Sequence, residues 1–111
     1  MDLTCVLEEV AGRVVLAVRG ELDLATLPTF RDHLSRAVQR NPGQAVFVDL
    51  DEVASADDVA LCVLLAAAAH ARRNHGEVRV VCSLPHMRDR LAELRLDQVV
   101  SVSGSLTADP A

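Results

Sequence analysis

The order of apolar and polar residues at the start of the chain predicts two short strands. Apolar positions alternate, imperfectly, over Thr4–Val10, and a second apolar run covers Val14–Arg19. A period of two residues is typical of a strand with one buried face. Between the two runs, Ala11-Gly12-Arg13 supplies a turn. The segment Gly20-Glu21-Leu22-Asp23 then breaks the apolar pattern, so we expect the second strand to end near Arg19.

The next segment has the period of an amphipathic helix. Thr26 is suited to the N-cap and Pro28 to the first turn, where a missing N–H costs nothing. Asn41-Pro42-Gly43 ends the pattern. We therefore expect a helix that packs one face on a sheet. The apolar residues on that face are Phe30, Leu34, Ala37 and Val38.

A central strand and a second helix follow. Ala45–Leu50 is a nearly continuous apolar run, as expected of a strand buried on both sides. We place the helix from about Asp57 to Asn74, with His75-Gly76 ending it. Because Val59–Ala69 is apolar almost all round, most of the circumference of this helix should be covered.

The last third of the chain repeats the alternation of strand and helix. Val78–Cys82 is another buried strand, Ser83-Leu84-Pro85 begins a helix, and Gln98–Val102 adds a final strand. The residues expected to point inward from that helix are Met87, Leu91 and Leu94. The resulting order is ββαβαβα(β), an α/β fold with one mixed sheet of four to five strands and helices packed against it.

The length of 111 residues suits a single domain. We expect its core to span about residues 3–102 and residues 103–111 to form a flexible tail.

Composition excludes several classes of function. Half of the residues are apolar, which argues against disorder. Phe30 and Phe47 are the only aromatic residues and the formal charge is −5, so the stacking surfaces and the positive field used in nucleic-acid binding are both missing. The chain has no lysine, which excludes a P-loop lysine and a Schiff-base lysine.

Neither the cysteines nor the histidines have the spacing of a chemical site. Cys5, Cys62 and Cys82 are far apart and each lies in an apolar run, so we expect them to fill the core rather than form disulfides or hold zinc. Arg72 and Arg73 are most simply interpreted as cations that interact favourably with the negative end of the second helix dipole. The histidines, interpreted as solvated or helix-terminal, are His33, His70, His75 and His86. We expect no catalytic residue, cofactor or metal.

No targeting or membrane segment is predicted. Met1-Asp2-Leu3 lacks the positive region and long apolar block of a signal peptide. The most apolar helix, about Val59–Ala71, is shorter than the roughly 20 residues that a span requires. We therefore expect a cytoplasmic protein without direct membrane insertion.

Acidic side chains crowd the junction between the central strand and the second helix, with no basic residue among them. They are Asp49, Asp51, Glu52, Asp57 and Asp58. A carboxylate is favoured where a helix begins, and such junctions are common ligand or partner sites in α/β folds. Ser55 to Asp58 also fits a capping box, with Ser55 as N-cap and Asp58 at the third helical position. Paired carboxylates can also hold Mg²⁺ or perform acid–base chemistry.

Three local sequences, in this order of elements, resemble the STAS domain, the fold of bacterial anti-sigma factor antagonists that is also found in sulfate transporters. The run from Gly20 to Thr26, GELDLAT, is close to the family's G-E-L-D-x-A-T after the second strand. The run from Val48 to Val53, VDLDEV, matches its V-D-L-x-x-V. The third, LRLDQVV from Leu94, is similar to its C-terminal L-x-G-L-D-x-x-x, with Arg95 at the usual glycine. The resemblance spans roughly residues 3–102.

The resemblance also implies a phosphorylation switch. In such antagonists the second helix opens with D-S-S-G or D-S-T-G, and the anti-sigma factor, a serine kinase, phosphorylates the first hydroxyl residue after the Asp. The unmodified antagonist binds that kinase and releases the sigma factor; the phosphorylated form does not bind. Here Asp57 matches the motif's Asp, Asp58 occupies the phosphoacceptor position, and Val59 and Ala60 replace the second hydroxyl and the glycine.

The carboxylate at position 58 changes what that switch can do. Phosphoserine carries about −1.5 to −2 charges at neutral pH, whereas Asp58 carries about −1 permanently. We expect no phosphorylation at position 58, so that the domain either imitates the phosphorylated form imperfectly or no longer uses the switch. A displaced acceptor at Ser55 is an alternative.

Together these features predict a non-enzymatic protein-interaction module that binds an anti-sigma serine kinase or another regulatory partner. The partner-binding residues expected from the resemblance are Glu21, Asp23, Ala25, Thr26, Ser55, Asp57, Asp58 and Val59. For Asp23, capping of the first helix is the alternative. Another function within this class is the STAS subunit of an ABC-type lipid transport complex, which also lacks the switch. A more remote one is a phosphoaspartate receiver with Asp49 or Asp51 as acceptor, although receivers need a lysine and more βα units.

Overall fold

The alternating residues at the start of the chain form an antiparallel pair of strands. The computed structural model describes residues 2–105, and in it β1 spans Leu3–Val10 and β2 spans Arg13–Leu22. β2 continues past Arg19, where the sequence pattern breaks, because register shifts after Ala17 and Gly20 restore its pairing with β3. The strand is therefore longer than predicted, and its bulged end carries the Gly20–Asp23 segment.

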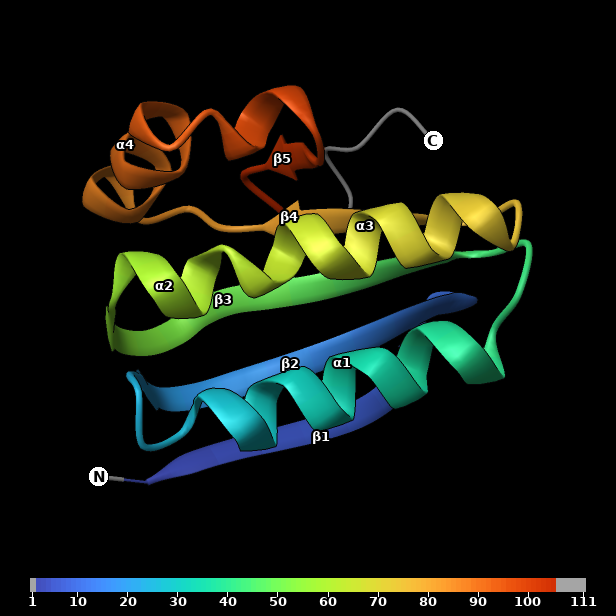
Figure 1. Ribbon diagram of the computed structural model, residues 1–111, viewed down its shortest axis with the longest axis horizontal. Coiled ribbons are helices and arrows are strands. Elements are labelled where there is room, and N and C mark those ends of the chain that lie inside the picture. The colour runs from blue at the N-terminus through green and yellow to red at the C-terminus, as the bar shows by residue number, and fades with distance from the viewer. Residues whose placement is uncertain (1, 106–111) are drawn as a thin grey trace.

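Five strands form one mixed sheet in the order β1-β2-β3-β4-β5 (Figure 1). β3 spans Ala45–Ala56, β4 spans Glu77–Val81 and β5 spans Ser101–Ser103. β2 to β5 run parallel, and β1 is antiparallel to β2. The predicted α/β class, element order and mixed sheet are confirmed.

The end of the chain departs from the prediction in detail. The last strand begins at Ser101 rather than at Gln98, because Leu96–Gln98 forms a short 3₁₀ helix, η1. Ser103, expected in the tail, completes β5. The part of that expected tail from residue 106 onward lies outside the described residues.

The helices lie on one face of the sheet. α1 spans Leu27–Arg40, and each crossover from β2 through β5 moves one strand further in the same direction. Since such crossovers are right-handed, they place successive helices on the same face; Figure 1 shows α1 and α3 side by side in front of the strands. The predicted inner faces of α1 and of α4, which spans Pro85–Glu93, are buried, with Leu94 partly buried just beyond α4.

The predicted second helix is divided. α2 spans Asp58–Leu61 and α3 spans Val63–Arg73, with Cys62 at the junction. The expectation that its circumference would be mostly covered is wrong, because Val59 is 58% and Leu65 39% exposed. The helix rests on the sheet and against α1, and within residues 2–105 no further layer covers its outer side. Cys62 lies on that outer side, so it does not fill the core as expected.

The opposite face of the sheet is covered by side chains instead of helices. Val15, Phe47 and Val81 form a small cluster there, separate from the main core. The guanidinium groups of Arg13 and Arg79 lie 5.2 and 5.8 Å from the centre of the Phe47 ring. The first half of β3 is thus buried on both sides, as predicted: the helices cover one side, and the side chains around Phe47 cover the other. Among residues 2–105, no helix is long and apolar enough to cross a membrane.

Candidate functional site

The predicted site residues after β2 and after β3 meet at one end of the sheet. The extended register places Glu21 beside Ser55 and Leu22 beside Ala56. The Asp57 N–H donates to the Leu22 carbonyl at 2.8 Å, which ties the start of α2 to the end of β2. This is the carboxyl end of the parallel strands, where α/β folds commonly bind ligands and partners (Figure 1).

The loop between β2 and α1 is held by its own side chains. The Thr26 hydroxyl donates to the Glu21 carbonyl at 2.7 Å and accepts from the Asp23 N–H at 3.0 Å. In return, the Thr26 N–H donates to the Asp23 carboxylate at 3.0 Å. Thr26 lies at the N-cap as predicted, but its buried hydroxyl makes no bond to the helix. Asp23 and Thr26 therefore shape the loop and leave Ala25 exposed at its tip.

Gly20 has a steric reason to be glycine. Its φ is +111°, a conformation that L side chains rarely adopt, and an added Cβ would lie 2.1 Å from the Asp2 carbonyl oxygen. The loop thus begins at a point where the backbones of β1 and β2 approach each other closely.

Two apolar side chains stand out from this end of the molecule. Leu24, in the loop after β2, is 70% exposed, and Val59, in the first turn of α2, is 58% exposed. Val59 was predicted as a site residue, but Leu24 was missed because it occupies the variable position of the GELDLAT motif. An apolar residue in a loop otherwise rich in acids is the signal that could have identified it.

α2 does not begin with the predicted capping box. Ser55 and Ala56 are still in β3, and the N-cap residue is Asp57, whose side chain makes no capping hydrogen bond. The bulged pairing with β2 keeps these residues extended, so the helix begins later than the motif suggested. Asp58 is the first helical residue and is exposed, where its charge is favoured by the free backbone N–H groups.

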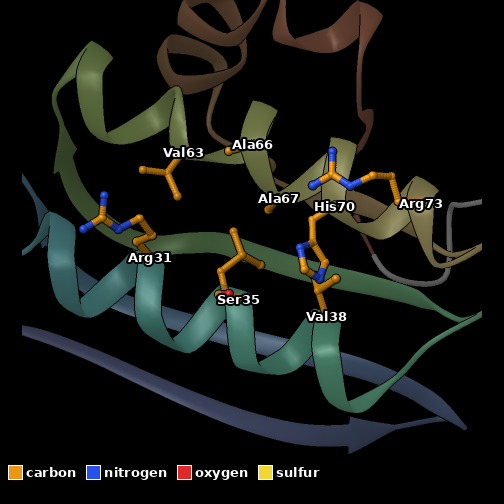
Figure 2. A pocket seen from close by; sticks show the side chains of 9 residues that line it. Arg31, Ser35, Val38, Val63, Ala66, Ala67, His70 and Arg73 are labelled. Atoms are coloured by element: carbon orange, nitrogen blue, oxygen red, sulfur yellow. The ribbon is translucent and has the colours of Figure 1, made fainter.

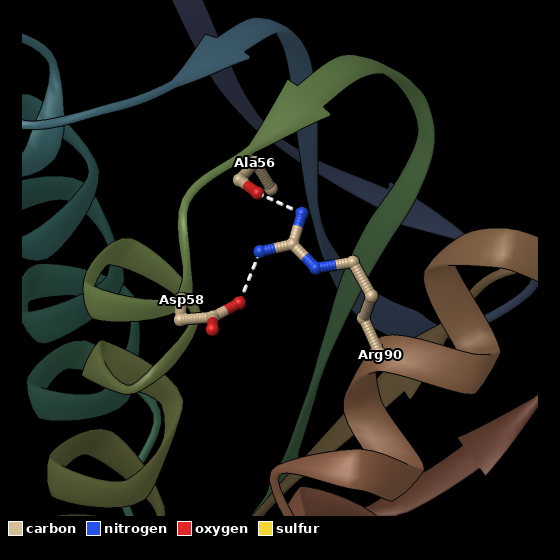
Figure 3. Close-up of polar contacts among 3 residues, drawn as sticks. All are labelled: Ala56, Asp58 and Arg90. Carbon is tan, nitrogen blue, oxygen red and sulfur yellow. Dashed lines mark hydrogen bonds and ion pairs between the residues drawn. The ribbon is translucent and has the colours of Figure 1, made fainter.

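A basic residue from a distant element contacts Asp58. The guanidinium of Arg90, on α4, donates through Nη2 to Asp58 Oδ1 and through Nη1 to the Ala56 carbonyl (Figure 3). The side chains of Arg90 and Asp58 are 35% and 60% exposed, so the pair lies at the surface. The charge of Asp58 is thus partly neutralised, and its orientation is set by α4. Sequence reasoning missed Arg90 because nothing in its local spacing relates it to Asp58.

Two other acids of the junction, Asp49 and Asp51, have structural partners. Asp51 Oδ1 accepts from the N–H and the hydroxyl of Ser83, at 2.6 and 3.0 Å, which links the middle of β3 to the loop after β4. Asp49 Oδ1 accepts from the Asp51 N–H at 3.0 Å. Within residues 2–105, no three His, Cys, Asp or Glu side chains are placed to share a metal ion. This arrangement lends no support to the metal and receiver alternatives.

Comparisons with known proteins identify a family and a set of similar structures. A family model described as Mlab, STAS domain, matches residues 5–102. A search of curated protein sequences finds no significant match.

Several solved structures share the fold. An anti-sigma factor antagonist from Mycobacterium paratuberculosis is 26% identical, with a TM-score of 0.84 over 96% of this chain and 89% of that one. An anti-sigma-factor antagonist (STAS) domain protein from Planctomyces limnophilus is 14% identical, with a TM-score of 0.78 over 93% and 92%. The unphosphorylated form of the Bacillus antagonist SpoIIAA is 18% identical, with a TM-score of 0.74 over 95% and 92%.

Proposed function

This chain belongs to the STAS domain family, and we propose on that premise that it is a protein-interaction module of the anti-sigma factor antagonist type. It binds an anti-sigma serine kinase or another regulatory partner and catalyses no reaction. The similarity to the mycobacterial antagonist, over nearly the whole length of both chains, supports this class of partner.

The partner docks on what we call the strand-end surface. This surface consists of Glu21, Asp23, Leu24, Ala25, Ser55, Asp57, Asp58 and Val59, with Thr26 beneath it. The observation that carries the proposal is the pair of exposed apolar side chains, Leu24 and Val59, flanked by carboxylates on two elements joined by hydrogen bonds. Docking removes exposed apolar side chains from water, a few such central contacts carry much of the binding energy, and surrounding charges set the partner's orientation and association rate.

The charge of the strand-end surface does not switch. An antagonist with a hydroxyl at this position changes its charge by about −1.5 to −2 when phosphorylated. Asp58 holds a constant charge that is already paired with Arg90, and it has no hydroxyl that a serine-directed kinase could phosphorylate. The domain therefore binds its partner in a way that does not depend on phosphorylation at this position.

The apolar part of the proposal is tested by exchanging exposed side chains. Leu24→Ser and Val59→Ser should each weaken binding to the purified partner kinase by about tenfold or more, measured by isothermal titration calorimetry. Leu65→Ser is the matched control, because Leu65 is also exposed but lies on α3 outside the strand-end surface. Equal affinity of all three variants and the unmodified protein would remove this surface as the interface.

The constant-charge part is tested with the kinase and ATP. We expect no phosphate on the unmodified protein at position 58, whereas Asp58→Ser should become phosphorylated there, as read by mass spectrometry of peptides. Asp58→Ala is the control without either carboxylate or hydroxyl. Phosphate on Asp58, or on Ser55 in the unmodified chain, contradicts the proposal.

A second candidate is the STAS subunit of an ABC-type lipid transport complex. Two observations favour it: the carboxylate at position 58, since such subunits also lack the switch, and the Mlab description of the matching family model. In that role the strand-end surface would brace an ATPase subunit. The two candidates are separated by titrating the protein with an ATPase subunit and with a kinase, both encoded near its gene. The true partner is the one that binds the unmodified protein and binds Leu24→Ser more weakly.

A further inference from the structure

A groove between α1 and α3 lies outside the strand-end surface. It has a volume of about 240 Å³, and its walls come from residues of both helices, including Val38 on one side and Val63 and Ala66 on the other (Figure 2). None of the residues of the strand-end surface lines it. The volume is below the roughly 300–1,000 Å³ typical of sites for drug-sized ligands, so its occupant is small.

The middle of the groove is mainly apolar, with Ser35 as its polar residue, and its ends are basic. Figure 2 shows Arg31, with Val63 across from it, at one end and His70 with Arg73 at the other, with Ser35 and Ala66 between them. Among the residues that the structure describes, no acidic side chain lines the groove, although the whole chain carries a formal charge of −5. Since Val38 lies seven residues after Arg31 on α1, the groove extends about 10 Å along that helix at 1.5 Å per residue.

The arginines of the groove are free to bind a ligand. Within residues 2–105, neither Arg31 nor Arg73 forms an ion pair or a side-chain hydrogen bond. Their neighbours differ: Arg36 pairs with Asp32 at 3.2 Å, and Arg72 donates to the Val99 carbonyl. Arg31 and Arg73 are exposed, and each could therefore pair with an anion at its end of the groove.

Helix electrostatics explain only part of this charge. His70 and Arg73 lie in the last turn of α3, where cations are favoured by the helix dipole. Arg31 lies just past the first turn of α1, where a positive charge gains nothing from the dipole. Its presence opposite the α3 cations calls for a second reason, and an anion in the groove supplies one.

From this geometry we infer that the α1–α3 groove binds a small free carboxylate with a short apolar body. The apolar chain lies against Val63 and Ala66, and the carboxylate pairs with Arg73 or Arg31 at an end of the groove. This site is independent of the partner surface, and its occupancy does not require the proposed function.

The test uses octanoate as the probe, below its micellar concentration, with the isotopically labelled full chain observed by NMR. Octanoate should shift the amide signals of residues lining the groove in a saturable way. Acetate, which has the charge but no apolar body, and octan-1-ol, which has the body but no charge, should each bind at least about fivefold more weakly.

Variants locate the site and provide controls. Arg31→Gln and Arg73→Gln should each weaken octanoate binding by about threefold to fivefold, while Arg40→Gln, on α1 outside the groove, should not. Ala66→Leu fills the groove and should reduce affinity by at least about tenfold. Ala69→Leu is the matched control, because Ala69 is an exposed alanine of α3 that does not line the groove.

Specific outcomes overturn the inference. They are octanoate shifts confined to other parts of the molecule, equal effects of Arg40→Gln and Arg73→Gln, or full affinity in Ala66→Leu with its native circular dichroism spectrum. Co-sedimentation with phosphatidylglycerol vesicles, in a protein that does not respond to octanoate, would instead assign the basic residues to a lipid surface.

Discussion

Three cysteines that look alike in the sequence lie in three different environments. Cys82 is fully buried, Cys5 is half-buried on β1, and Cys62 is exposed where α2 meets α3. Burial raises the pKa of the Cys5 thiol to about 11. The pKa of Cys82 is also raised, chiefly by burial, and the charge of Asp51 adds to the effect. Since the thiolate is the reactive form, a raised pKa makes a cysteine slow to react at neutral pH.

Thiol labelling should therefore distinguish the cysteines. With a maleimide reagent at about pH 8, Cys62 should react at least about tenfold faster than Cys5 in the folded protein. Raising the pH toward the Cys5 pKa increases its thiolate fraction, so its rate should climb while the fold persists. Cys62→Ser should abolish the fast phase and Cys5→Ser should leave it intact, as followed by mass spectrometry. Fast labelling that survives in Cys62→Ser would contradict this expectation.

The ion pair between Asp58 and Arg90 changes the charge presented at the surface more than it stabilises the fold. Both side chains are at least one-third exposed, and surface pairs of this kind contribute about 0–1 kcal/mol. What Arg90 provides is a fixed orientation of the carboxylate at the edge of the strand-end surface. A partner that approaches this surface meets a carboxylate already bound to a cation.

Among the elements, the turn between α4 and η1 depends on one residue in a left-handed conformation. Arg95 has φ 59° and ψ 24°, and its N–H donates to the Ala92 carbonyl at 2.9 Å. The L-x-G-L-D pattern that this segment resembles has glycine at this position, and glycine adopts this conformation without steric cost. This chain makes the same turn with a side chain that has a Cβ, and the strain is of order 1 kcal/mol.

Replacing this arginine with glycine should stabilise the protein. We expect Arg95→Gly to raise the free energy of unfolding by about 0.5–1 kcal/mol, because relief of the left-handed strain exceeds the added freedom of the unfolded chain. Arg95→Ala, which keeps the Cβ, should bring no such gain. Urea unfolding followed by circular dichroism measures both, since the chain has no tryptophan or tyrosine for fluorescence. A loss of stability in Arg95→Gly would show that the arginine makes a favourable contact that offsets the strain.

At the scale of the whole molecule, the two faces of the sheet are protected differently. Phe30, from α1, is completely buried in the main core between helices and sheet. Phe47 is 4% exposed on the opposite face, where arginine side chains rather than helices cover its ring. A layer of flexible side chains can close over a lost ring more easily than a packed helix can move.

The two phenylalanines should therefore differ in their contribution to stability. Phe30→Ala should cost about 3–5 kcal/mol of unfolding free energy, the range found for fully packed aromatic side chains. Phe47→Ala should cost less, about 1–3 kcal/mol, because Arg13 and Arg79 can repack over the gap. The urea midpoints of the two variants show which substitution costs more unfolding free energy. An equal or larger loss for Phe47→Ala would mean that its face is packed as firmly as the core.

Local sequence determined the class of elements and their order. Periods of two and of 3.6 residues, with the turns at Ala11–Arg13 and Asn41–Gly43, suffice to predict four strands and a fifth with other bounds, the helices between them and the buried faces of α1 and α4. The GELDLAT and VDLDEV motifs led to the family because they hold the ends of β2 and β3, where backbone demands such as Gly20 restrict the residue.

Only the tertiary structure decided what depends on contacts between distant segments. The bulged pairing of β2 with β3 extended both strands and placed the N-cap at Asp57 rather than at Ser55, against the local capping pattern. Right-handed crossovers placed the helices on one face, so the apolar α3 kept an exposed side. The contact of Arg90 with Asp58 joins two elements far apart in the chain. Periodicity and motifs report the preferences of a few neighbouring residues, whereas these features follow from how separate elements pack.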